Sequence, residues 1–229
     1  EPGEWWLDRS TGLLYVWPPA GFDTADVLLS TLADAIVNIK DGSWIELRDL
    51  RIESGRAELV TLTEGTHVSL VGLTLHHAGT NAVVMSGTNH RVDHCYIANP
   101  GSGGVRVSGG DRPTLLEAGN VVEHSRVEKY GQWEWTYRPA VDLQGVGHIV
   151  RHNLMRDAPH SAILYSGNEH TIELNEIHGV CEYSSDAGAI YAGRDWGARG
   201  NIIRHNFLHD IRTHFEGYGV HGVYLDDCL

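Results

Sequence analysis

Aspartates crowd in the last third of the chain. Asp186 precedes the run AGAIYAG, Asp195 follows it, and Asp226 with Asp227 ends the run GVYLDD. Hydrolysis of a glycosidic bond uses two carboxyl groups, about 5 to 5.5 Å apart when the sugar configuration is retained and roughly 6.5 to 9.5 Å apart when it is inverted. A pair drawn from these four aspartates is the most specific catalytic arrangement that the sequence offers.

The choice of pair depends on how their strands align. In the repeat described below, Val223 aligns with Ile190. Asp195 lies five residues after Ile190, and Asp227 lies four residues after Val223. Similar offsets on adjacent strands favour Asp195 with Asp227. Asp186 lies four residues before Ile190, and an extended path of about 3.3 Å per residue would separate it from Asp227 by more than roughly 20 Å.

Polar and aromatic residues border the same strands. Two histidines precede the strand positions equivalent to Ile190, so they border the edge that holds Asp186 and could bind sugar hydroxyls or tune a carboxyl pKa. Aromatic faces stack on sugar rings, and two tyrosines occupy adjacent outward positions. The predicted substrate-binding residues are His160, Tyr191, Arg194, Trp196, His221, Tyr224 and Asp226.

Histidines recur in columns that invite a metal interpretation. His94, His124, His152 and His205 occupy one column that faces outward, and a second column lies near a turn. Stacked imidazoles without an interleaved acid are more typical of a repeated surface than of zinc ligands. The HxxxH spacings indicate zinc only on a helix, and these lie on expected strands. We therefore predict no metal site.

The elements that position these residues form a repeat. The segments LVGLTL, VDHCYI, VEHSRV, VRHNLM, IELNEI and IRHNFL align without gaps, with apolar residues at both ends. Between them runs the column Leu50, Leu73, Cys95, Ser125, Asn153, Asn175, Asn206. Stacked asparagines can hydrogen-bond one another at the strand spacing of about 4.8 Å. A second set of aligned strands alternates with the first, so each coil holds at least two strands. This pattern predicts an all-β solenoid of the parallel β-helix type.

The first 40 residues follow a different pattern. WWLDRSTGLLYVWPP places two β-prone runs around a Ser-Thr-Gly turn, which predicts a hairpin. We expect an N-terminal hairpin and connecting segment over residues 1–40 and β-helix coils over residues 41–229.

Composition excludes several classes of protein. The 229 residues carry 17 Lys plus Arg against 30 Asp plus Glu, a net charge of −13, and 41% are hydrophobic. This composition is globular, and its charge opposes binding to nucleic acid or anionic lipid through bulk electrostatics. We expect no membrane span, no nucleic-acid partner and no obligate protein partner. Three scattered cysteines provide no disulfide framework.

Several of these segments resemble a known family. The hairpin, the asparagine coils, DAPHSAILYSGNEHTIELNEIH, DAGAIYAGRDWGARGNIIRHNFLHDI and GVYLDD are similar to right-handed parallel β-helix proteins of carbohydrate metabolism, closest to glycoside hydrolase family 141 and its relatives. The resemblance covers nearly the whole chain. It implies an aspartate pair, matched to Asp186 in DAGAIY and Asp227 in YLDD, and further coils after YLDD, so we expect the chain to be truncated.

The resemblance also sets an expected function. It implies a secreted or periplasmic bacterial glycoside hydrolase that acts on plant or microbial polysaccharide without a cofactor. The expected mechanism is retaining, through double displacement by two aspartates. Which aspartate is the acid and which the nucleophile stays open, because the roles depend on desolvation.

Two other functions stay open. A calcium-dependent polysaccharide lyase would use Asp226 and Asp227 for the ion and Arg194 or Arg199 as the base. A non-catalytic glycan-binding β-helix would have the same coils without a proximal carboxyl pair.

Structural roles are the alternative for each aspartate. Asp186 would then initiate a turn, and Asp195 would form an ion pair with Arg194 or Arg199.

Overall fold

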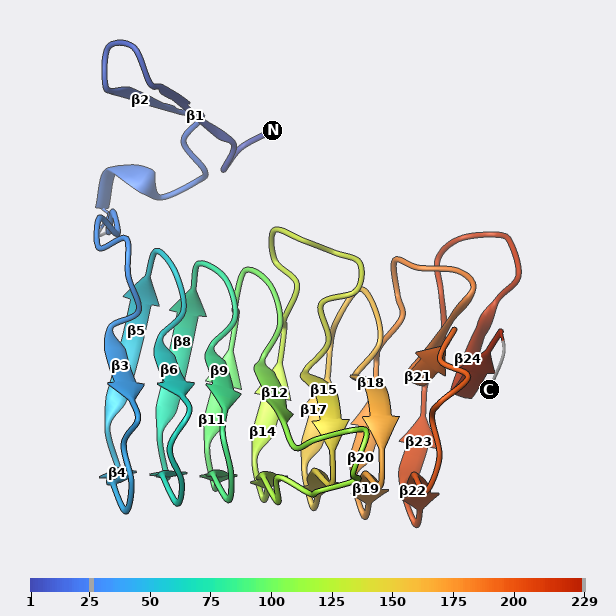
Figure 1. The fold of residues 1–229 in the computed structure, drawn as a ribbon. Helices are drawn as coiled ribbons and strands as arrows, with labels where there is room; N and C mark the ends of the chain where they lie inside the picture. Colours follow the sequence, from blue (N-terminus) through green and yellow to red (C-terminus); the bar gives the residue numbers. More distant parts are fainter. Residues whose placement is uncertain (25–26, 228–229) are drawn as a thin grey trace.

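The computed structural model describes residues 1–24 and 27–227, and strands dominate them (Figure 1). The chain begins with an antiparallel hairpin of β1 (Trp5–Asp8) and β2 (Leu13–Val16), followed by a short 3-10 helix, η1 (Phe22–Thr24). Three parallel sheets follow. The part of the chain that the structure describes contains no helix with the length and apolar character needed to cross a membrane.

Each coil contributes one strand to each of the three sheets. The first sheet contains β4 (Glu46–Arg48), β7 (Ser69–Val71), β10 (Arg91–Asp93), β13 (Val121–Glu123), β16 (Ile149–Arg151), β19 (Thr171–Glu173) and β22 (Ile202–Arg204). The second contains β5 (Arg51–Gly55), β8 (Thr74–Ala78), β11 (Tyr96–Ala98), β14 (Arg126–Glu128), β17 (Leu154–Arg156), β20 (Glu176–His178) and β23 (Phe207–His209). The third contains β3 (Val37–Lys40), β6 (Val60–Thr63), β9 (Val83–Ser86), β12 (Val105–Gly109), β15 (Val141–Val146), β18 (Ile163–Asn168), β21 (Ala187–Gly193) and β24 (Val220–Asp226).

The observed register confirms the predicted alignment. Ile163 pairs with Ile190, and Ile190 pairs with Val223, as the apolar columns require. The inward residues of all three sheets form one continuous buried core. Burial of this stacked apolar surface holds the coils together, because each coil alone would leave both of its apolar faces exposed to water.

A bend in each coil divides the aligned segments into two short strands. The residue before the ladder column has a positive φ, for example 53° at His94, 46° at His124 and 56° at His152. Histidine, asparagine and aspartate tolerate this left-handed conformation better than most residues. The histidines predicted to lie on strands therefore lie at corners, which explains why histidine recurs there.

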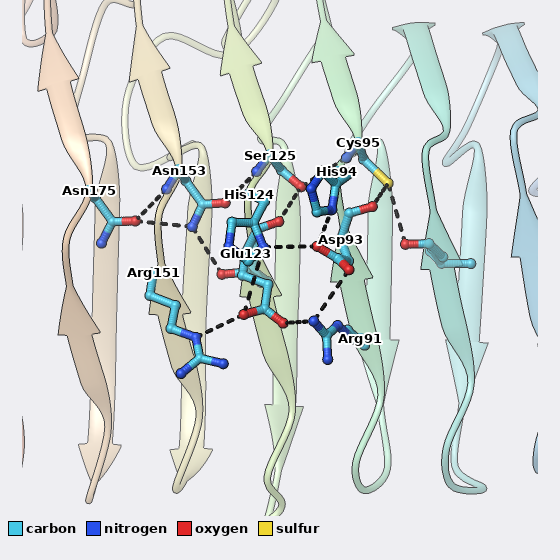
Figure 2. A network of polar contacts seen from close by, with 12 residues as sticks. Arg91, Asp93, His94, Cys95, Glu123, His124, Ser125, Arg151, Asn153 and Asn175 are labelled. Carbon is cyan, nitrogen blue, oxygen red and sulfur yellow. Dashed lines mark hydrogen bonds and ion pairs between the residues drawn. The ribbon is translucent and has the colours of Figure 1, made fainter.

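The predicted asparagine ladder is present (Figure 2). Oδ1 of Asn175 accepts hydrogen bonds from the backbone N–H of Asn153 at 3.1 Å and from its side-chain amide at 3.0 Å. Asn206 binds Asn175 in the same way, and Oδ1 of Asn153 accepts from the N–H of Ser125 at 2.9 Å. The ladder satisfies buried backbone groups that the bend removes from the sheets.

A second polar column lies two residues before the first apolar column. Its members are His90, Asn120, His148, His170 and Asn201. Nδ1 of His170 accepts the backbone N–H of His148 at 3.1 Å, and Oδ1 of Asn201 accepts that of His170 at 2.9 Å. The ring of His148 stacks on that of His170 at 5.1 Å. These histidines are buried and structural.

The N-terminal part agrees with the sequence in type but not at its boundary. Trp5 pairs with Val16 across the expected hairpin. β3 begins at Val37 and pairs in parallel with β6, so residues 37–40, which we assigned to the connecting segment, belong to the first coil.

Candidate functional site

The candidate site lies on the outward face of the last two strands of the third sheet, β21 and β24. Tyr191 is the register partner of Tyr224, and Gly188 is the partner of His221. Ile190 and Val223 alternate with the tyrosines in direction, since successive side chains of a strand point to opposite faces. Ile190 is buried in the core, which directs Tyr191 outward.

Two carboxylates converge on these tyrosines. The hydroxyl of Tyr224 donates to Oδ1 of Asp186 at 2.8 Å, and that of Tyr191 donates to Oδ2 of Asp226 at 2.7 Å. The hydrogen bond to Asp186 raises the pKa of Tyr224 to about 12, with contributions from its burial and from the charge of Asp226. Burial and the bond to Asp226 also raise the pKa of Tyr191. Asp186 and Asp226 therefore bind the hydroxyls of two neighbouring tyrosines, whose ring centroids lie 5.6 Å apart.

The strands bend near Asp186, so that the path from Asp186 to the end of β24 is not regularly extended. The register between β21 and β24 is interrupted opposite Gly222, between the Gly188 and Ile190 pairs. A Cβ atom added to Gly188 would lie only 2.6 Å from Cβ of Tyr224, so the two backbones approach closely there. Asp186 itself has a φ of 57° and donates its N–H to the carbonyl of Gly219 at 2.8 Å. The bend brings Asp186 within reach of the Tyr224 hydroxyl.

Aromatic rings surround this cluster. The ring of His221 lies 4.7 Å from that of Tyr224, and the ring of Tyr137 lies 6.5 Å from Tyr191 and 5.0 Å from His160. His160 is buried, and burial lowers its pKa to about 4, so the imidazole is neutral at physiological pH. Tyr137 was missed from the sequence. It belongs to the 129–140 insertion, whose segment WEWTY holds three aromatic residues that could have indicated it.

The other two predicted catalytic aspartates form ion pairs with arginine. Asp195 forms an ion pair with Arg112 at 2.9 Å, and that contact lowers its pKa. Asp227 pairs with Arg194 at 3.5 Å. Asp195 and Asp227 thus bind different arginines, and Arg112 comes from an insertion that the repeat does not place. The backbone N–H of Arg194 donates to the carbonyl of Asp227 at 2.7 Å, so the two aspartates lie at the ends of paired strands, as the alignment predicts. Trp196 is 86% exposed.

The outward histidine column also differs from expectation. Oδ1 of Asp93 lies 2.6 Å from Nδ1 of His94 and 3.1 Å from Nδ1 of His124, so an acid does interleave with the imidazoles (Figure 2). The rings of His94 and His124 stack at 4.8 Å, and those of His124 and His152 at 5.1 Å. Two shallow grooves of about 400 and 540 Å³ meet at His94. Neither groove is lined by a residue of the Asp186 cluster.

Comparison with known proteins supports the fold. A family model described as "Right handed beta helix region" matches residues 35–126. Neither the curated proteins nor the solved structures give a match to the chain. The comparisons do not support the narrower likeness to glycoside hydrolase family 141. With three parallel sheets and this match, the chain is a right-handed parallel β-helix protein.

Proposed function

We propose that the chain acts on a polysaccharide as a retaining glycoside hydrolase, with Asp186 and Asp226 as the carboxyl pair. The observation that carries this proposal is that the two carboxylates accept hydrogen bonds from neighbouring tyrosines on paired strands, Asp186 from Tyr224 at 2.8 Å and Asp226 from Tyr191 at 2.7 Å. The charge of Asp226 also raises the pKa of Tyr224, so this carboxylate lies near the hydroxyl that binds Asp186. Retaining glycosidases hold their carboxyl groups about 5 to 5.5 Å apart.

The chemistry would proceed by double displacement. One carboxylate attacks the anomeric carbon while the other carboxylic acid protonates the departing glycosidic oxygen; the second group then removes a proton from water, which attacks the same carbon and releases the sugar. Asp226 takes the place that we predicted for Asp227 or Asp195, because both of those carboxylates form ion pairs with arginine. The reaction requires no cofactor.

Neighbouring side chains would bind the sugar. The rings of Tyr137, Tyr191 and His221 border the carboxylates and offer apolar faces for stacking. The two tyrosine hydroxyls hold the carboxylates in place. An enzyme of this substrate class would meet polysaccharide outside the cytoplasm, so we propose a secreted or periplasmic location.

The test is hydrolysis of a panel of cell-wall polysaccharides and aryl glycosides by the chain and its variants. We expect Asp186→Asn and Asp226→Asn each to lower the rate of sugar release by a factor on the order of 100 or more. The matched control is Asp195→Asn, an aspartate of the same region that binds Arg112, and it should keep most of the activity. Equal losses in all three folded variants would contradict the assignment.

Binding without catalysis is the second candidate, because the two grooves described above are lined by residues other than the carboxylates. Retention of a polysaccharide on an affinity gel, abolished by Tyr191→Ala but without sugar release, would favour it. An unsaturated product absorbing in the ultraviolet would instead favour the lyase, with calcium as its cofactor.

A further inference from the structure

We propose that Asp93, His94 and His124 form a binding site for a divalent transition-metal ion of the Zn²⁺ class, which would join two adjacent coils. Asp93 ends β10 and His94 follows it at the corner, while His124 occupies the equivalent corner one coil later (Figure 2). The site is separate from the Asp186 cluster and does not depend on its function.

The three donor atoms already converge. One ring nitrogen of His94, one of His124 and a carboxylate oxygen of Asp93 all lie within 4.8 Å of one another. In a tetrahedral zinc site with bonds of about 2.0 to 2.1 Å, donor atoms lie roughly 3.4 Å apart, so small side-chain rotations would suffice. Two imidazole nitrogens and one carboxylate are ligands that suit zinc and disfavour calcium or magnesium.

The fold holds these ligands before any ion binds. Both histidines lie at left-handed corners, which fixes the direction of their side chains. His152 stacks on His124 with an interplanar angle of 6°, and His124 stacks in turn on His94. Held parallel in this way, both rings direct Nδ1 toward the same Asp93 oxygen. A site whose ligands are already ordered loses little entropy on binding.

The charge pattern along the column favours a cation here. Successive partners in the first sheet are Asp93, Glu123, Arg151, Glu173 and Arg204. The signs alternate except at Asp93 and Glu123, two acids on adjacent strands, and like charges directly opposite are destabilising. Glu123 contacts Arg91 and binds Arg151 at 2.8 Å, with its side chain only 1% exposed. Arg91 reaches Oδ2 of Asp93 at 3.3 Å, which leaves Oδ1 to the imidazoles.

An ion could reach this site from solvent. The side chain of His94 is 64% exposed, whereas that of Asp93 is 13% exposed. Both grooves described above include His94 in their lining, one on the side of Asp93 and the other on the side of His124. Water in these grooves would complete the coordination.

A second cluster provides a comparison. Glu176, His178 and His209 also bring three donor atoms together. There both ring nitrogens of His209 face carboxylates, Asp210 at 2.9 Å and Glu176 at 3.4 Å. Two carboxylates thus compete for the ring of His209, whereas the two imidazoles of the proposed site share one carboxylate oxygen.

The test is zinc binding by the untagged chain, measured by competition with a chromophoric chelator near neutral pH. We expect one tight site, and absorption bands of tetrahedral cobalt when Co²⁺ replaces Zn²⁺. Asp93→Asn and His124→Gln should each weaken binding by roughly tenfold or more, since loss of a ligand costs at least as much as loss of its supporting contacts. His94→Gln, at an exposed position, provides a third ligand variant should Asp93→Asn not fold.

Two controls make the result decisive. His205→Gln removes a histidine of the same corner column that is not part of the Asp93 group, and it should bind zinc as the parent does. His209→Gln removes the second cluster and should also leave tight binding intact. Absence of a tight site in the parent, or a loss of binding in His209→Gln alone, would overturn the proposal.

Discussion

Acidification should destabilise the protein through its buried histidines. His148 is fully buried, its Nε2 donates to the carbonyl of Gln144 at 3.0 Å, and burial lowers its pKa to about 4. His170 has a lowered pKa for the same reason, and its Nδ1 must stay unprotonated to accept the N–H of His148. A second proton on either ring would place a charge in the core.

The sign and size follow from linkage. An unfolded histidine binds its proton near pH 6.5, whereas native His148 does so only near pH 4, so the unfolded chain binds more protons between these values. The free energy of unfolding therefore falls as the pH falls through this window. From about pH 7 to about pH 5 the loss is about 2 kcal/mol for His148. His160, with a pKa of about 4, should add a similar loss of about 2 kcal/mol.

Urea unfolding followed by circular dichroism at several pH values measures this loss. His148→Gln keeps a side-chain donor for the Gln144 carbonyl but has no titrating group, so its free energy of unfolding should fall by about 2 kcal/mol less than that of the parent between the two pH values. His205→Gln, at an exposed corner, should follow the parent. His209 acts in the opposite direction. Its pKa is raised, so the stability that this exposed histidine contributes is lost as the pH rises. If the parent and His148→Gln lost the same free energy, the reasoning would fail.

Two further substitutions test the packing of the coils, both measured by urea unfolding. Asn153→Ala removes the buried acceptor of one backbone N–H and the donor of one carbonyl, so we expect a loss of about 2 to 4 kcal/mol, and a smaller loss for Asn206→Ala at the less buried end of the ladder. Gly145→Ala would place Cβ 2.0 Å from the carbonyl oxygen of Gly109, at a residue whose φ is 114°. The control is Gly12→Ala, whose Cβ would meet no atom within 4 Å and which should lower the free energy of unfolding by roughly 1 to 2 kcal/mol. We expect Gly145→Ala to lower it several times as much. Equal losses within either pair would contradict the corresponding contact.

The sequence predicts the coils well because their inward residues obey one rule. Each coil must bury an apolar residue against its neighbours, so Ile163, Ile190 and Val223 reveal the register directly. The asparagine ladder is predicted for the same reason, since a repeated hydrogen-bond geometry requires a repeated side chain.

The candidate sites could be predicted only in part, because they depend on features outside the repeat. Tyr137 and Arg112 lie in insertions whose paths no column determines. The bend near Gly188 depends on close backbone contact, so a regularly extended path does not describe it. Asp93 was overlooked because it lies one residue before the histidine column and not within it. The alignment gives no indication that its carboxylate turns toward two rings.

The corners of the coil explain why chemistry can arise in this fold with few changes. A left-handed residue is required at each corner, and the side chains that tolerate this conformation include aspartate, asparagine and histidine, which are also donors to metals and sugars. Parallel stacking then places equivalent corners at close range, as the 4.8 Å between the rings of His94 and His124 shows. Two imidazoles thus meet as a consequence of backbone geometry alone. One added carboxylate, Asp93, is enough to turn a structural column into a set of ligands, and it alters no residue of the core.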